Sequence, residues 1–135
     1  MIAVIDTSVW SLALRRTGRA SSREATELAE LVREGRAAII GPVRQELLSG
    51  MKSQEQFELL REHLRGFRDT ELTTSDFELA ADFFNQCRGR GVQGSNTDFL
   101  ICAVAHQRRQ SVFTADADFA RFATVIPIVL HTVRT

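Results

Sequence analysis

Four acidic residues of this chain stand where a small α/β domain presents its chemistry. Asp6 directly follows a short apolar run, and Glu46 lies one helical turn into the segment after a second such run. Asp98 follows a glycine-rich stretch, and Asp116 lies two residues beyond the run 111–114. In an open α/β sheet, ligands bind outside the carboxyl ends of the strands. The sequence therefore predicts that these four carboxylates meet on one rim of a sheet.

Such a group of carboxylates needs positive partners. Two carboxylates about 4 Å apart repel each other by roughly 4 kcal/mol at an effective dielectric near 20, so the group must bind protons or cations. No Lys or His is adjacent to any of the four in the sequence. Hard oxygen ligands favour Mg²⁺ or Mn²⁺, whereas Zn²⁺ prefers Cys and His. A divalent ion makes hydroxide available near neutral pH and neutralises a leaving oxygen, which suits phosphodiester hydrolysis.

Each acid also has a plain structural interpretation. Asp6, Asp98 and Asp116 stand where an acid would cap a helix or complement its dipole. Glu46 would suit the solvated face of a helix. The joint placement of all four is what favours a site.

Buried strands and amphipathic helices alternate along the chain and would position these acids. Continuous apolar runs predict strands at 2–5, 37–40 and 111–114, and a terminal edge strand at 125–130 that tolerates Pro127. Capping residues and apolar spacing predict the helices at 9–12, 22–34, 42–48, 54–64, 74–87, 96–109 and 116–123.

Three finer expectations concern the middle of the chain. Residues 71–73 read as a brief strand. The helix that begins at about Thr74 would bury a face carrying Phe77, Ala80, Ala81 and Phe84. The glycine-rich segment 88–95 reads as a loop. The alternation as a whole predicts an α/β fold with a mostly parallel sheet and helices on both faces.

Length and composition predict one soluble domain. The chain has 135 residues, with 44% hydrophobic and 25% charged, which is ordinary globular usage. No apolar run approaches the roughly 20 residues of a membrane span, and the first residues do not resemble a signal peptide. Cys87 and Cys102 lack metal-ligand spacing and read as buried free thiols in a reducing compartment. We therefore expect a cytoplasmic protein without membrane attachment.

The basic residues give a weaker indication. Seventeen basic side chains balance seventeen acidic ones, so the overall field does not draw the protein onto nucleic acid. One stretch is locally basic because it carries Arg15, Arg16, Arg19 and Arg23. These arginines are candidates for RNA phosphate contacts, and a solvated loop is the alternative.

At these motifs the sequence resembles the PIN-domain ribonucleases, and in particular the VapC toxins of bacterial type II toxin–antitoxin modules. The resemblance covers essentially the whole chain, 1–135, as one PIN domain. It depends on Ile5-Asp6-Thr7-Ser8-Val9-Trp10, on the segment 42–50, on Asp98-Phe99-Leu100-Ile101-Cys102-Ala103 and on Thr114-Ala115-Asp116-Ala117-Asp118-Phe119. Four motifs in the right order and spacing make it specific.

The resemblance implies an α/β/α sandwich of three layers and Mg²⁺- or Mn²⁺-dependent cleavage of RNA. It also implies a homodimer and inhibition by a cognate VapB-like antitoxin. The family's catalytic acids fall on Asp6, Glu46, Asp98 and Asp116. Supporting roles fall on Thr7, Ser8, Thr114 and Asp118, and Asn96 is expected either to contact substrate or metal-bound water or to cap a helix.

The resulting hypothesis is hydrolysis by metal-activated water. Asp6, Asp98 and Asp116 would hold the principal ion, while Glu46 orients water or binds a second ion. Haloacid-dehalogenase-like phosphatases want a second Asp where this chain has Ser8, and a receiver domain wants a Lys after a later strand, so neither fits. The alternative that stays open is a catalytically weak PIN-like module that binds RNA or protein. For the antitoxin, the apolar residues Trp10, Leu12 and those of 42–64 could form either a groove or simply core.

Overall fold

The computed structural model describes residues 1–14 and 22–134. In these residues three short parallel strands form one sheet in the order β2-β1-β3. The strands are β1 (Ala3–Ile5), β2 (Ala37–Ala38) and β3 (Ser111–Phe113). Ala3 pairs with Ala37 on one side and with Ser111 on the other, so β1 is the central strand. All three of its residues are completely buried, as expected for a strand covered on both faces.

Helices fill the intervals between the strands. They are α1 (Thr7–Leu14), α2 (Arg23–Arg33), α3 (Gly41–Ser49), α4 (Gln54–Leu64), α5 (Thr74–Gly89), α6 (Asn96–Gln107) and α7 (Asp118–Phe122). Side-chain caps begin four of them, since the hydroxyls of Ser22, Ser53, Thr73 and Ser95 each accept a first-turn amide. Helix α3 begins differently, with Pro42 in its first turn, where a missing amide hydrogen is harmless.

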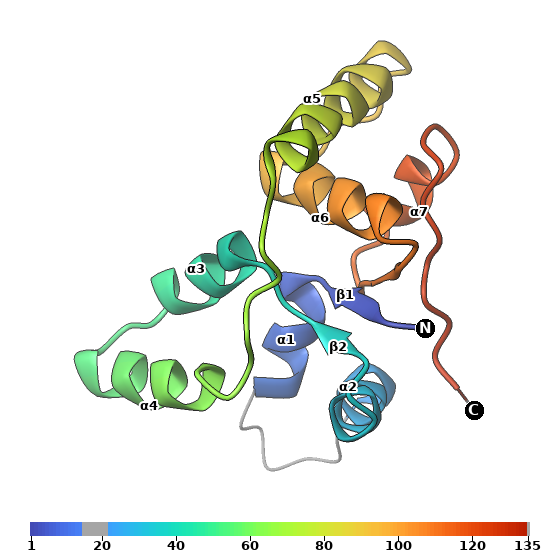
Figure 1. The fold of residues 1–135 in the computed structure, drawn as a ribbon. Coiled ribbons are helices and arrows are strands. Elements are labelled where there is room, and N and C mark those ends of the chain that lie inside the picture. The colour runs from blue at the N-terminus through green and yellow to red at the C-terminus, as the bar shows by residue number, and fades with distance from the viewer. Residues whose placement is uncertain (15–21, 135) are drawn as a thin grey trace.

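The sheet lies between two groups of helices (Figure 1). Helices α5 and α6 lie over one face, and α1 and α2 lie against the other, while α3 and α4 extend to the side. The predicted α/β class with a parallel sheet and helices on both faces is therefore confirmed.

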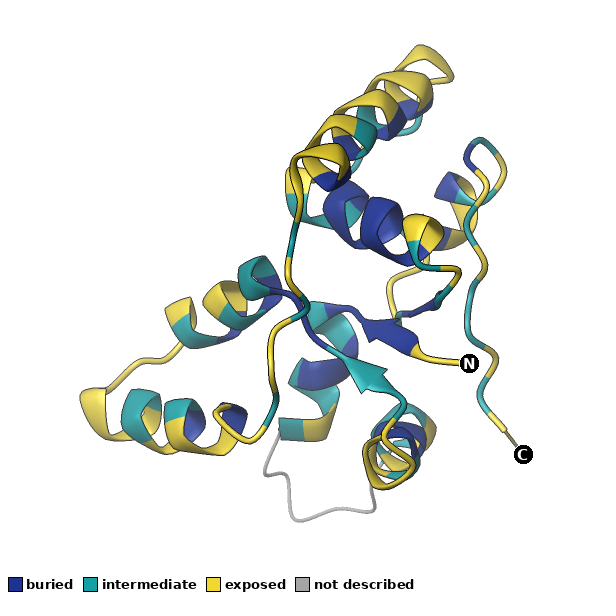
Figure 2. Cartoon of the chain, viewed as in Figure 1, coloured by how far each residue is buried: buried dark blue, intermediate teal, exposed yellow. Residues whose placement is uncertain are grey.

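The buried core is formed mainly by the sheet and by one central helix, α6 (Figure 2). Helix α6 is buried over seven consecutive residues, 99–105, because it packs on β1, β3 and α5. Its hydrophobic surface all round is typical of a helix enclosed by its neighbours. Cys87 and Cys102 are both buried free thiols, as predicted. No helix among the described residues is long and apolar enough to cross a membrane.

Several predicted elements are wrong in detail. Residues 71–73 form no strand; Asp69 instead makes an isolated bridge with Ile39. The terminal strand 125–130 reduces to a single bridge between Val112 and Leu130. Helix α5 runs on to Gly89, so the loop begins only at residue 90.

The predicted buried face of α5 is right for Ala80, which is buried, and for Phe84, which packs against the core, but wrong for Phe77 and Ala81, which are exposed. Asp76, Ala80, Phe83 and Cys87 are buried, whereas Phe77 is 54% exposed. The apolar spacing allows two helix faces that share Ala80 and are rotated slightly from one another: one contains Phe77 and Phe84, and the other contains Phe83 and Cys87. Asp76 decides between them because its carboxylate forms a buried ion pair with Arg108 at the end of α6, which fixes the rotation of the helix.

Candidate functional site

Asp6 stands at the end of the central strand and is 5% exposed. Its Oδ2 accepts hydrogen bonds from the Ser8 hydroxyl at 2.7 Å and from the Thr114 hydroxyl at 2.8 Å. The predicted helix-capping role does not describe this side chain, because none of the described amides donates to it; the first amides of α1 use its backbone carbonyl. Parallel pairing of β1 with β3 places Thr114 beside Asp6.

The two hydroxyls have fixed directions. Ser8 Oγ accepts the amide of Ala115 and Thr114 Oγ1 accepts the amide of Asp116, both at 2.9 Å. Since each hydroxyl oxygen already accepts a hydrogen bond from an amide, its own hydrogen is free to point at Asp6. This network ties Asp6 to the loop that carries Asp116.

Asp98 lies in the first turn of α6. Ser95 and Asp98 form a capping box, in which each side chain accepts the other's backbone amide. The pKa of the Asp98 carboxyl is raised, first by burial and then by the negative charges of Asp6 and Asp116. The hydrogen bonds from Ser95 oppose this effect without cancelling it. Asp98 therefore lies close enough to both Asp6 and Asp116 for their negative charges to act on it.

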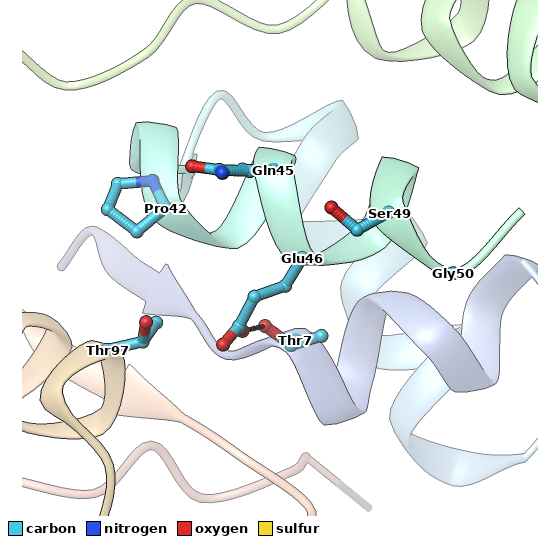
Figure 3. A pocket seen from close by; sticks show the side chains of 7 residues that line it. All are labelled: Thr7, Pro42, Gln45, Glu46, Ser49, Gly50 and Thr97. Carbon is cyan, nitrogen blue, oxygen red and sulfur yellow. Dashed lines mark hydrogen bonds between the residues drawn. The ribbon is translucent and has the colours of Figure 1, made fainter.

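Glu46 approaches from α3. Its Oε1 accepts the Thr7 hydroxyl at 2.6 Å, and Thr7 is the neighbour of Asp6 in the sequence. Figure 3 shows Glu46 reaching toward Thr7, with Thr97 of α6 beside them. These three residues line one open pocket together with Pro42, Gln45, Ser49 and Gly50.

The four carboxylates share one feature that bears on metal binding. Each has one oxygen held by a local donor: Oδ2 of Asp6, Oε1 of Glu46, Oδ2 of Asp98 and Oδ1 of Asp116. Within the described part of the chain, the second oxygen of each accepts no hydrogen bond, and no Arg, Lys or His forms an ion pair with any of the four. Charged oxygens with no cationic partner are the donor set that Mg²⁺ and Mn²⁺ prefer.

The donors are not gathered around one point. In residues 1–14 and 22–134 no group of three or more His, Cys, Asp and Glu side chains is placed so that it could hold a metal ion directly. Mg²⁺ commonly keeps several waters and takes only one or two protein carboxylates. The residues present therefore fit an ion held partly through water.

Cys102, the cysteine nearest to Asp98 in the sequence, is unsuited to act as a nucleophile or metal ligand at this site. The Cys102 thiol lies in α6 one turn beyond Asp98, and its pKa is raised by burial and by the charge of Asp98. A thiol kept protonated is a poor nucleophile and a poor metal ligand.

The remaining residues predicted from the sequence differ in their positions and contacts. The amide of Asp118 donates to Asp116, while its carboxylate faces Arg121 in a long exposed ion pair. Asn96 does not cap α6, because Ser95 does so. Arg23 is exposed at the start of α2, and the predicted contacts of Arg15, Arg16 and Arg19 lie outside the described residues. Trp10 is 2% exposed and packs edge-on against Phe67, so for this residue the core interpretation is right.

Two sets of residues were missed from the sequence. Ser95 could have been found, because Ser-x-x-Asp before an apolar run is a capping-box signature. Gln45 and Ser49 lie within the motif segment 42–50, but neither they nor Thr97 were predicted to belong to the site. Only the helical spacing of Pro42, Glu46 and Ser49, at i, i+4 and i+7, shows that they share one face.

Comparisons with known proteins agree with the fold described above. The sequence finds no significant match among curated proteins. Among solved structures, FitAcB from Neisseria gonorrhoeae is similar with a TM-score of 0.75 and 23% identity, over 97% of each chain. VapBC2 from Rickettsia felis, bound to a DNA fragment from its promoter, gives 0.77 and 20%, over 97% of this chain and 98% of that one. VapBC-5 from Mycobacterium tuberculosis, described as a member of the VapBC family of toxin–antitoxin systems, gives 0.67 and 19% over the same shares.

These similarities establish the fold, since the identities are low. The family follows from the sequence itself. The model of the PIN domain matches residues 3–125, from the first residue of β1 to just beyond α7, and so includes all four acids. This chain belongs to the PIN domain family.

Proposed function

We propose that this protein is a divalent-metal-dependent endoribonuclease and the toxin of a VapBC-type toxin–antitoxin pair. The proposal is carried by the free oxygens of Asp6, Glu46, Asp98 and Asp116 and by the lack of any cationic partner for them among the described residues. Membership of the PIN domain family and the likeness to VapBC and FitAcB structures support it.

The residues divide the work as follows. Asp6, Asp98 and Asp116 would hold Mg²⁺ or Mn²⁺ partly through water, and Glu46 would orient water or bind a second ion. When bound, the ion lowers the pKa of a coordinated water and neutralises charge on the phosphate. Ser8 and Thr114 fix the rotamer of Asp6, so that its Oδ1 stays free. Ser95 does the same for Asp98.

Cleavage of a labelled single-stranded RNA by the purified protein tests the enzymatic part. We expect cleavage with Mg²⁺ and none with excess EDTA. Asp6→Asn and Asp98→Asn should each lower the rate by more than the roughly 10–100-fold typical of changes outside the ligand shell. Asp82→Asn is the matched control, because Asp82 is exposed on α5 and its carboxylate accepts a hydrogen bond from Gln86, its one partner among the described residues.

The ends of the products test the chemistry. Attack by water leaves no 2′,3′-cyclic phosphate, whereas attack by the RNA's own 2′-hydroxyl produces one. RNA binding without cleavage, unchanged in Asp6→Asn, would favour the alternative of a binding module.

The toxin part is tested in cells. Induced expression should arrest bacterial growth, and Asp6→Asn should abolish the arrest. Co-expression of a cognate VapB-like antitoxin should relieve it and yield a soluble complex, in which the homodimer we propose can be measured by light scattering. Growth that continues normally while active enzyme accumulates would refute the toxin assignment.

A further inference from the structure

The pocket beside Glu46 has room for a ligand larger than a metal ion. It lies between α3, the start of α1 and the start of α6 (Figure 3), and its volume is about 630 Å³. Sites for small organic molecules typically measure about 300–1,000 Å³. The pocket is open to solvent, so it could receive one part of a nucleotide, such as its base, against the walls formed by α3, α1 and α6.

The chemistry of its walls selects the kind of group. Glu46 is the only ionisable side chain among the seven that line it, and it is negative. Three neutral polar side chains, those of Gln45, Ser49 and Thr97, have no hydrogen-bond partner in the described residues. Among the seven lining residues a phosphate would meet no cationic side chain, and the negative charge of Glu46 would repel it wherever no ion is bound beside that residue. An uncharged ring with donors and acceptors on its edge suits these walls.

The pocket also has a defined position relative to the acids. Thr7 and Thr97 line it, and each is the direct sequence neighbour of a proposed metal ligand, Asp6 and Asp98. Thr7 further holds Glu46 by a 2.6 Å hydrogen bond. A nucleic acid whose phosphate reaches the acids would therefore bring an adjacent base to this pocket.

We propose that the pocket binds one nucleobase next to the scissile phosphate, and that Gln45 selects which base enters. The inference rests on the proposed nuclease function and adds the element of substrate recognition. A glutamine amide presents a donor and an acceptor side by side, which allows two hydrogen bonds to one base edge. Entry requires an unpaired, unstacked base, so the preferred substrate is single-stranded RNA or a loop.

Sequencing the cut ends of a randomised single-stranded RNA pool tests this directly. The wild-type protein with Mg²⁺ should show a base preference at one position beside the cut. Gln45→Ala should reduce that preference by about 5- to 100-fold, the range of a lost bidentate contact, because cutting beside the preferred base slows while cutting beside the other bases changes less. Gln56→Ala is the matched control, since Gln56 is exposed on α4 outside the pocket.

A second measurement does not depend on cleavage. Each of the four nucleosides, which carry no phosphate, is titrated into labelled protein while backbone amide resonances are followed by NMR. We expect shifts at Gln45, Ser49, Gly50 and Thr97, largest for the preferred base, and their loss in Gln45→Ala. The same titration of Gln56→Ala should match the wild type.

The two measurements separate failure of this inference from failure of the proposed function. RNA cleavage with a base preference unchanged in Gln45→Ala, and no nucleoside shifts, overturns the pocket and leaves the nuclease intact. Nucleoside shifts at the pocket without any metal-dependent cleavage support the pocket and overturn the nuclease.

Discussion

The Ser8 hydroxyl donates a 2.7 Å hydrogen bond to Oδ2 of Asp6 and accepts the amide of Ala115. Residues 107 positions apart in the chain are joined in this way through one side-chain oxygen. The bond holds a carboxylate of the central strand against the loop after β3. It thereby couples the orientation of Asp6 to the position of Asp116.

Ser8→Ala should impair catalysis without unfolding the protein. The variant removes one of two hydroxyl donors to Asp6 and leaves the Ala115 amide without its acceptor. Groups that orient metal ligands typically contribute about 10–100-fold in metal affinity or activity. We expect a loss of kcat/KM within that range and a weaker apparent affinity for Mg²⁺, measured by titrating the cleavage rate with Mg²⁺.

Ser8→Thr is the control, because it keeps the hydroxyl. It should retain most of the activity that Ser8→Ala loses. Equal activity of Ser8→Ala and the wild type at limiting Mg²⁺ would show that Thr114 alone fixes Asp6.

The repulsion around Asp98 predicts a pH-dependent stability in the absence of metal. Burial and the charges of Asp6 and Asp116 raise the pKa of Asp98 above its ordinary value of 3.8. Below that value the group is protonated in both folded and unfolded protein and has no effect. As the pH rises through the raised pKa, the folded state loses stability relative to the unfolded state.

Asp98→Asn should therefore melt at a higher temperature than the wild type at pH 7 in EDTA, with the difference closing toward pH 4. Mg²⁺ should then raise the Tm of the wild type more than that of the variant, since a ligand stabilises the state that binds it. Scanning calorimetry at several pH values measures both effects. A lower Tm for Asp98→Asn at pH 7 in EDTA, beside an unchanged Asp82→Asn, would mean that the hydrogen bond to Ser95 outweighs the repulsion.

Local signals in the sequence were sufficient for much of the fold. Helix α4 has the predicted bounds, Gln54–Leu64, because Ser53 caps it and its apolar spacing is regular. The central strand was evident from its continuous apolar run, and its parallel pairing with β3 places Thr114 beside Asp6.

The features that could not be predicted from the sequence depend on contacts between residues far apart in the chain. Residues 125–130 have a strand-like composition, but their pairing is limited to one bridge. The amide of Val112 in β3 donates to the carbonyl of Val129, and the amide of His131 donates to the carbonyl of Val112. The face of α5 depends on the ion pair of Asp76 with Arg108. Similarly, no local pattern links Thr7 to Glu46 or places Gln45 at the pocket.

The C-terminal segment provides a further prediction. Buried Glu27 of α2 accepts hydrogen bonds from His131 at 2.6 Å and from Arg134 at 3.0 Å. Burial alone would raise the pKa of Glu27, but these two partners outweigh it and lower the pKa below 4.5. The stabilisation is therefore present above the ordinary pKa and is lost as the pH falls through the lowered one.

Glu27→Gln should lower the Tm at neutral pH, and its deficit should shrink as the pH falls below about 4. Glu78→Gln is the control and should match the wild type, because Glu78 is exposed on α5 and has no hydrogen bond or ion pair among the described residues. A deficit of constant size from pH 7 to pH 3 would show that shape, and not charge, determines the effect.

Gly94 holds the loop before α6 against two buried aromatic rings. A Cβ at this position would lie 2.5 Å from Cζ of Phe122 and 3.0 Å from Cε2 of Phe99. Both rings are buried in the core, where Phe99 and Phe122 pack at a tilt of 42° with centroids 4.8 Å apart. Gly94→Ala must therefore displace the loop, at a cost of about 1–3 kcal/mol for overpacking.

Since Ser95 follows directly, the displacement should also disturb the capping box of Asp98 and reduce cleavage. Gly89→Ala is the matched control, because its Cβ would meet nothing within 4 Å and the residue ends helix α5. Alanine in a helix is favoured over glycine by roughly 0.5–1 kcal/mol, so this control should be as stable as the wild type or more stable. Urea denaturation of both variants measures the two free energies of unfolding, and equal values would show that the loop can move away from the rings without penalty.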